Sequence, residues 1–197
     1  MFTDAACPVP VGHTLLPIAR AAIATALGRR LEAVEDAAWL QETGACFVTL
    51  TQQGQLRGCI GTLQAHRTLL ADVKANAVAA ALHDPRFAPL ATIELERTEI
   101  EVSLLSPLQA LQFDSEAHVL AQLRPGVDGM VLEFGHYRST FLPQVWEQLP
   151  TASGFLAQLK RKAGLPPDFW APGVRLQRYS VSKWKESELP LSADGGA

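Results

Sequence analysis

The feature that most constrains this chain is a pair of β-forming runs joined by a short turn. Residues 45–61 contain two such runs on either side of the turn sequence Gln52–Gly54, which predicts a β-hairpin. The second run carries Gly58 and Gly61, although glycine weakens a strand because it loses more backbone entropy than other residues and packs no side chain. We therefore expect either a bend or another group that approaches the backbone beside Cys59.

Alternation along the second run divides its side chains between the two faces of the sheet. Leu56 and Ile60 are expected to face the core, and Arg57, Cys59 and Gly61 to share the other face. We interpret this second group as one side of a small polar site.

The rest of the chain mixes helical and strand-like patterns. Pro107 and the pair Gly164 and Pro166 are stop signals, Thr68 is a candidate helix cap, and Gly28 is a candidate C-terminal stop. The expected elements are helices over 14–27, 69–82, 115–123 and 155–163, strands over 98–105 and 175–184, and a second hairpin over 130–142.

Hairpins interrupted by helices predict an α+β fold with a mainly antiparallel sheet and flanking helices. The length of 197 residues fits one compact domain, with or without a small subdomain. We assign this domain to residues 11–185, a flexible lead-in to 1–10 and a disordered tail to 186–197.

Composition excludes several classes of protein. The net charge is −3 and there is no block of basic residues, so nucleic-acid binding is not expected. No apolar run is long enough to span a membrane, and the N-terminus lacks the regions of a secretory signal. The three cysteines, Cys7, Cys46 and Cys59, cannot form a disulfide framework, which predicts a reducing, cytoplasmic location.

Cys59 has two interpretations. Beside the cationic Arg57 it is a candidate nucleophile, redox thiol or metal ligand, because a nearby cation lowers a thiol pKa. Alternatively it is a buried cysteine that packs like a small hydrophobe. With a two-residue loop, Cys59 lies opposite Val48 and Cys46 lies opposite Gly61, so the two sulfurs share a face but are diagonal to each other. With a three-residue loop they lie on opposite faces. Neither register places them directly opposite each other, so a disulfide is not predicted.

Four further polar residues are candidates for a site. Asp84 and Arg86, after a predicted helix end, form either an anion-binding arginine held by its carboxylate or a structural turn with an ion pair. Glu101, with Ser103 on the same strand face, is either a general base or part of a solvated strand.

Metal and phosphate sites have little support. No two histidines have metal-binding spacing on a helix and there is no Cys-x-x-Cys, so we predict no metal site. The alternative is a site formed by Cys59, His66 and His83. There is also no phosphate-binding loop and no Gly-x-Ser-x-Gly elbow.

The stretch Leu56–Thr62 (LRGCIGT) resembles the signature of the AMMECR domain family, whose bacterial and archaeal members are called AmmeMemoRadiSam system protein A. Cys46 is a departure from the expected pattern, outside the signature. Between Leu15 and Trp184, similar motifs follow in the order of the family: Gly44–Leu50, Asn76–Ala77, Ala79–Ala80, Asp84–Phe87, Glu101–Ser103, Leu105–Ser106, Leu142–Val145 and Lys162–Leu165.

The resemblance implies an α+β fold with a cleft near the signature. It also implies two partners, a Memo-family protein that resembles metal-dependent dioxygenases and a radical S-adenosylmethionine enzyme; it implies no particular cofactor. The candidate catalytic residues are Cys59 and Glu101, and the candidate binding residues are Arg57, Gly58, Gly61, Asp84, Arg86, Ser103 and Gln144.

Three functions follow from these observations. The preferred hypothesis is a binding or accessory module with a cleft at Leu56–Thr62 for a small ligand or a partner segment. The first alternative is a cysteine-dependent enzyme or redox component that uses Cys59. The second is a purely structural role for the motif.

Overall fold

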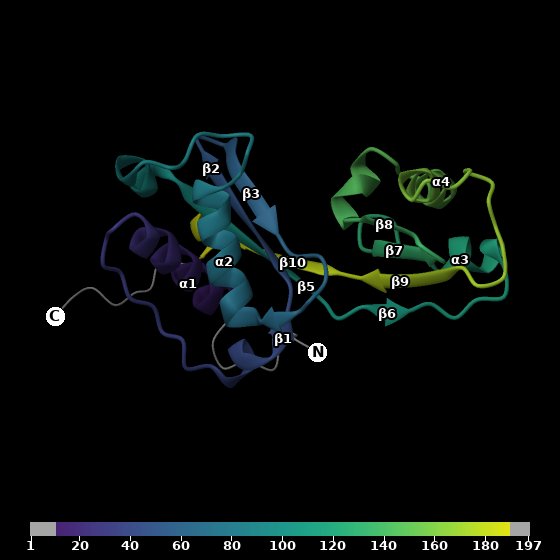
Figure 1. The fold of residues 1–197 in the computed structure, drawn as a ribbon, viewed down its shortest axis with the longest axis horizontal. Helices are drawn as coiled ribbons and strands as arrows, with labels where there is room; N and C mark the ends of the chain where they lie inside the picture. Colours follow the sequence, from purple (N-terminus) through teal and green to yellow (C-terminus); the bar gives the residue numbers. More distant parts are fainter. Residues whose placement is uncertain (1–10, 190–197) are drawn as a thin grey trace. The chain divides into compact units, whose positions relative to one another are not determined.

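A computed structural model describes residues 11–189 of the chain, so the predicted lead-in over 1–10 lies outside the described residues. The chain divides into two units, coloured along the sequence in Figure 1. The first unit extends to Leu105 and resumes at Ser182, and the second is Ser106–Val181. Both combine helices with antiparallel strands, which confirms the predicted α+β class. Among the described residues, no helix is long and apolar enough to cross a membrane.

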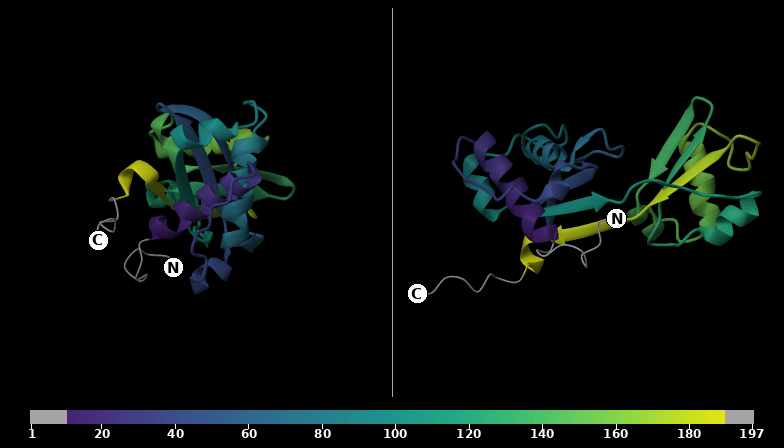
Figure 2. Two further views of the ribbon diagram at one scale, coloured as in Figure 1. Left: turned by 90° about the vertical axis from the view of Figure 1, so that its left-hand side faces the viewer. Right: turned by 90° about the horizontal axis from the view of Figure 1, so that it is seen from below.

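The first unit is a four-stranded sheet with strand order β10-β5-β2-β3 and two main helices. Figure 2 shows β10 beside β5. The elements of the first unit are α1 (Val11–Ala26), η1 (Ala38–Gln41), β1 (Thr43–Gly44), β2 (Cys46–Gln52), β3 (Gln55–Gly61), β4 (Arg67–Thr68), α2 (Leu69–Leu82), η2 (Thr92–Arg97), β5 (Glu99–Leu105), β10 (Val181–Lys185) and η4 (Glu186–Glu188).

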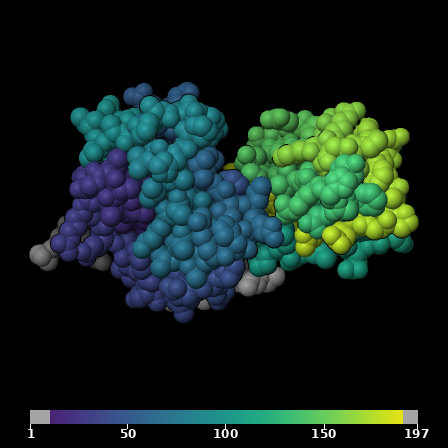
Figure 3. Space-filling model, in the orientation of Figure 1, coloured from purple at the N-terminus to yellow at the C-terminus, as the bar shows by residue number. Residues whose placement is uncertain are grey.

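The helices α1 and α2 cover one face of this sheet because the strand residues on that face are apolar. Val48 and Leu50 of β2 and Ile100 and Val102 of β5 are fully buried, in a core shared with both helices. Burial of each such side chain stabilises the fold by about 1.5–3 kcal/mol. Residues of α1 and α2 form much of the visible surface of the first unit in Figure 3.

Two of the predicted helix-boundary signals, Thr68 at a start and Gly28 after an end, are confirmed. The hydroxyl of Thr68 accepts a hydrogen bond from the N–H of Ala71 at 3.3 Å and caps α2. Gly28 follows the end of α1 with a left-handed φ of +77°, which glycine adopts without strain. The helix α1 begins at Val11, earlier than the predicted Thr14.

The turn of the first hairpin lies within the predicted turn sequence, but Gln52 is the last residue of β2, and the loop has the shorter of the two lengths that the sequence left open. Gln52 pairs with Gln55, so the loop contains two residues, Gln53 and Gly54. Their φ values of +50° and +76° are typical of the tight turns that suit the twist of a hairpin.

A β-bulge follows in β3 and was not predicted. Leu56 lies opposite Thr51 and Gly58 lies opposite Leu50, so Arg57 is an extra residue without a partner on β2. Such a bulge shifts the alternation of side chains by one position.

The bulge changes which residues of β3 share a face. Cys59 lies opposite Thr49, and Leu56 lies opposite the next β2 residue on that same face. Leu56 is therefore on the side of Cys59 and is 44% exposed, so its predicted place in the core is wrong. Ile60 packs against the core as predicted, and Arg57 does not share the face of Cys59.

The second unit has its own sheet, with strand order β6-β9-β7-β8, and its own core. The predicted second hairpin is confirmed, with Gly135 in the turn at a φ of +56°. Trp146 and Phe155 stack in the core with ring centroids 3.9 Å apart. The elements are β6 (Gln109–Ala110), α3 (Glu116–Gln122), β7 (Gly129–Phe134), β8 (Tyr137–Phe141), η3 (Pro143–Glu147), α4 (Ala152–Lys162) and β9 (Arg175–Tyr179).

The C-terminal part of the chain differs from the prediction in two ways. The strand predicted over 175–184 is two strands, β9 and β10, which belong to different sheets. Glu186, assigned from the sequence to the disordered tail, lies in η4, where its carboxylate accepts hydrogen bonds from Arg20 and from the N–H of Ile100. The fold therefore continues through residue 189, and residues 190–197 lie outside the described part of the chain.

Candidate functional site

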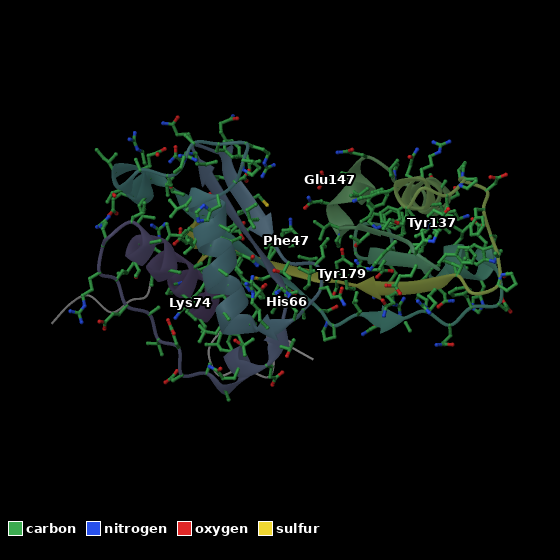
Figure 4. All side chains as sticks on the ribbon, in the orientation of Figure 1. Phe47, His66, Lys74, Tyr137, Glu147 and Tyr179 are labelled. Atoms are coloured by element: carbon green, nitrogen blue, oxygen red, sulfur yellow. The ribbon has the colours of Figure 1, made fainter. Side chains whose placement is uncertain are left out.

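Three strands of the first unit bring the two candidate catalytic residues onto one face. Thr49 of β2 lies opposite Cys59 of β3 and also opposite Glu101 of β5. Phe47, labelled in Figure 4, lies opposite Ser103 on the same face. We call these five residues the Cys59 face; it is opposite to the face that α1 and α2 cover.

The thiol of Cys59 has a hydroxyl, not a carboxylate, as its neighbour. Cys59 is partly exposed, and the hydroxyl of Thr49 donates a hydrogen bond to its Sγ at 3.3 Å. Glu101 lies beyond Thr49, and since adjacent strands are about 4.8 Å apart, the main chains at Cys59 and Glu101 are about 10 Å apart. The neighbours of the Glu101 carboxylate are the Lys183 ammonium at 3.9 Å, the Lys185 ammonium at 3.7 Å and the Ser103 hydroxyl at 3.4 Å.

Asp84 and Arg86 hold the main chain of Cys59. The carboxylate of Asp84 accepts a hydrogen bond from the N–H of Cys59 at 2.9 Å, and Arg86 donates one to the Cys59 carbonyl at 3.2 Å. Arg86 also donates to Asp84 from Nε at 2.9 Å and from Nη2 at 2.6 Å. Because β3 is an edge strand, its outward N–H and C=O groups would otherwise lack partners in the sheet.

The ion pair between Asp84 and Arg86 changes the pKa of the Asp84 carboxyl. The Arg86 guanidinium, together with the N–H of Cys59, holds the pKa of the Asp84 carboxyl well below its usual range. The side chain of Asp84 is only 2% exposed and that of Arg86 is 53% exposed. The ion pair expected from the sequence is therefore present, and it fixes the peptide groups of Cys59.

The two glycines of the motif allow close packing. A Cβ on Gly58 would lie 2.1 Å from the carbonyl oxygen of Ala80, so this glycine lets α2 approach β3. A Cβ on Gly61 would lie 2.2 Å from the ring of Phe47. The groups expected to approach the backbone are thus a helix carbonyl and an aromatic ring of the protein itself.

A second polar network, not predicted from the sequence, anchors the end of the motif. Asp72 is fully buried and accepts hydrogen bonds from the hydroxyl of Thr62 at 2.7 Å and from the N–H of Cys46 at 2.8 Å. Asn76 donates to the carbonyl of Cys46 at 3.0 Å, and Arg67 donates to Asp72. Asp72 and Asn76 lie four residues apart within the alanine-rich sequence of α2, and this spacing of two polar residues was the sequence signal that could have predicted the network.

Cys46 is a buried residue of this network. Burial is the main cause that raises its thiol pKa above the ordinary value. Neither Cys46 nor Cys59 forms a disulfide within the described residues. Cys46 points into the core and Cys59 to the other face, as the three-residue-loop register predicted, although the bulge is the actual cause.

The structure separates Arg57 from the Cys59 face. Arg57 donates to the carboxylate of Glu94 from Nε at 3.2 Å and from Nη2 at 3.1 Å. Gln52 donates to the same carboxylate at 3.2 Å. Arg57, followed by the N–H of Ala91, lowers the pKa of Glu94 to about 2, so this ion pair persists at neutral pH.

The remaining candidates lie elsewhere. Gln144 is an exposed residue of η3 in the second unit. Within residues 11–189, no group of three or more His, Cys, Asp or Glu residues is arranged to hold a metal ion. His66 bonds to the carbonyl of Gln64 and to no other described residue, and neither it nor His83 is hydrogen-bonded to Cys59.

Fold and site together define an α+β protein in which an edge-strand cysteine is held by an Asp–Arg pair. Residues 16–184 match the AMMECR1 family model. The chain belongs to the AMMECR1 family.

Similar proteins occur in archaea. A protein of Methanothermobacter thermautotrophicus is 38% identical over 185 residues, which cover 89% of this chain and 94% of that protein. A protein of Methanocaldococcus jannaschii is 36% identical over 155 residues, covering 75% of each chain. The crystal structure of an uncharacterized protein from Pyrococcus horikoshii has a TM-score of 0.72 at 32% identity, covering 89% of this chain and 91% of that chain.

Proposed function

We propose that this protein is a binding or accessory module of an AmmeMemoRadiSam-type system and that the Cys59 face is its binding site. The observation that supports the proposal most is the way in which neighbouring residues hold Cys59. Asp84 and Arg86 hold both peptide groups of this residue, while its thiol stays partly exposed beside Thr49. A binding residue must be held by its surroundings in one position, and this arrangement meets that requirement.

The chemistry of the Cys59 face suits a small ligand or an extended segment of a partner protein. Phe47 offers an aromatic ring, Thr49 offers a hydroxyl and Glu101 offers a carboxylate. These residues belong to two neighbouring residue pairs of β2 and β5 on one face of the sheet. The proposed partners are a Memo-family protein and a radical S-adenosylmethionine enzyme. The proposal includes a cytoplasmic location, where a thiol at the binding site stays reduced.

The experiment is a binding titration of the purified protein against each proposed partner, with Thr49→Arg as the blocking variant. Arginine at this position places a long cationic side chain in the middle of the Cys59 face. Ile93→Arg introduces the same side chain at a residue that is 74% exposed in η2 and serves as the matched control. We expect Thr49→Arg to weaken binding at least about tenfold, which corresponds to about 1.4 kcal/mol, and Ile93→Arg to bind like the wild type.

Two outcomes would contradict the proposal. Equal binding by Thr49→Arg and Ile93→Arg would exclude the Cys59 face as the contact. Failure of the wild type to bind either partner would exclude the partner assignment. Circular dichroism and thermal unfolding of both variants show whether each is folded.

The cysteine-dependent alternative has one supporting observation, the hydrogen bond from the Thr49 hydroxyl to the thiol of Cys59. Its test is the rate of iodoacetamide alkylation of Cys59 as a function of pH. An activated thiol reacts at neutral pH faster than in the denatured chain. A rate no faster than that of the denatured chain would exclude this alternative.

A further inference from the structure

A small pocket lies at the tip of the first hairpin, on the first unit. Its volume is about 320 Å³. Its lining comes from the end of β2, the hairpin turn, the start of β3 and the end of η2: Gln52, Gln53, Gln55, Leu56, Arg57 and Arg97. Among the described residues, the charged side chains of this lining are the two arginines.

Most of the polar groups in the lining have no partner in the protein. Gln53, Gln55 and Arg97 make no side-chain hydrogen bond or ion pair to any residue between 11 and 189. Gln52 differs, since its amide donates to Glu94 and to Thr98. The pocket therefore has amide and guanidinium donors to offer, but no carboxylate of its own.

Arg57 supplies a second, independent observation. Its Nε and Nη2 are used by Glu94, whereas its Nη1 is buried and has no hydrogen-bond partner among the described residues. A guanidinium stays protonated in proteins, so this atom remains a donor. A buried donor without an acceptor is costly and calls for an explanation.

Charge balance selects the class of ligand. Glu94 neutralises Arg57, so that within the described part of the chain the exposed Arg97 is the uncompensated charge of the pocket. Oxyanions accept several hydrogen bonds at once and pair well with guanidinium groups. We infer that this pocket binds an oxyanion, namely the phosphate or carboxylate group of a small molecule whose remainder contacts Leu56.

The bulge is what creates the site. By making Arg57 an extra residue in β3, it leaves the guanidinium beside Gln52 and Glu94 and away from the face of Cys59. The arginine of the motif and its cysteine then serve different surfaces. This inference is independent of the function proposed for the Cys59 face.

The test uses inorganic phosphate and, in a second arm, acetate, each titrated at constant ionic strength and followed by ¹H–¹⁵N NMR. We expect saturable shifts of the side-chain NH₂ signals of Gln53 and Gln55 and of the guanidinium N–H signals of Arg97 and Arg57. A preference for phosphate identifies a tetrahedral anion, and a preference for acetate identifies a carboxylate. No saturable shift with either probe would overturn the inference.

Arg97→Gln is the diagnostic variant, because this exposed side chain has no partner among residues 11–189 whose loss would disturb the fold. We expect it to weaken binding about tenfold, the usual effect of losing one charge-assisted hydrogen bond. Arg30→Gln removes the same charge from a side chain that is 91% exposed and is the matched control. Unchanged affinity in Arg97→Gln, or an equal loss in Arg30→Gln, would overturn the inference. Thr49→Arg is expected to retain phosphate binding, which separates this site from the Cys59 face.

Discussion

Replacing Asp84 with alanine tests whether the Asp84–Arg86 pair holds β3 in place. The Asp84 carboxylate accepts four hydrogen bonds, one from the N–H of Cys59 and three from the N–H, Nε and Nη2 of Arg86. Loss of the acceptor for Cys59 costs about 1–3 kcal/mol. Water compensates much of the loss at the half-exposed Arg86, so the ion pair adds at most about 1 kcal/mol. We therefore expect Asp84→Ala to lower the free energy of unfolding by about 1–4 kcal/mol.

The loss should depend on pH in a defined direction. Arg86 lowers the pKa of Asp84 in the folded protein below the value of the unfolded chain, which is about 3.9. Such a group contributes its full stabilisation above the unfolded pKa and loses it as the pH falls through the folded pKa. The difference in stability between the wild type and Asp84→Ala should therefore be constant above about pH 5 and shrink below about pH 4.

The assay is urea denaturation followed by circular dichroism at neutral and at acidic pH. Asp168→Ala removes an exposed carboxylate from the second unit and is the control, expected to change stability by less than about 0.5 kcal/mol. The reasoning would be refuted if Asp84→Ala were as stable as Asp168→Ala at neutral pH. It would also be refuted if the destabilisation were the same in acid.

Two further predictions concern packing and burial. Gly58→Ala places a Cβ against the carbonyl oxygen of Ala80, which cannot move without shifting α2. We expect thermal unfolding to show a loss of folding stability of about 1–3 kcal/mol or more. Unchanged stability would exclude the close contact. In the folded protein, iodoacetamide should label the partly exposed Cys59 and leave the buried Cys46 unlabelled until urea unfolds the chain, as read by mass spectrometry of peptides; equal labelling of the two in the native state would contradict the assigned faces.

The candidate site could be predicted only in part. Cys59 and Glu101 were identified from strand alternation, and the structure does place them on one face. The Asp84–Arg86 ion pair was also expected, but its hydrogen bonds to the peptide groups of Cys59 were not. The position of Thr49 between the two candidates was missed, because alternation shows the face of a residue and not its partners on neighbouring strands.

The sequence alone determined the features that depend on neighbours along the chain. Gly28 and Thr68 delimit helices, and Gln53 and Gly54 form the hairpin turn, because caps and turns are set by the conformational preferences of a few adjacent residues. The α+β class followed from the same local patterns.

Tertiary structure decided everything that depends on contacts between distant segments. The bulge in β3 accompanies an ion pair between Arg57 and Glu94, 37 residues further along the chain, and it reversed the predicted faces of Leu56 and Arg57. The close approach of Ala80 to Gly58 likewise joins residues that are far apart in the sequence. The conformational preferences of single residues are nearly the same with or without these contacts, so they do not reveal which strands and helices pair. Only the structure shows that Cys59 of the LRGCIGT motif lies on the Cys59 face and that Arg57 lines a separate pocket.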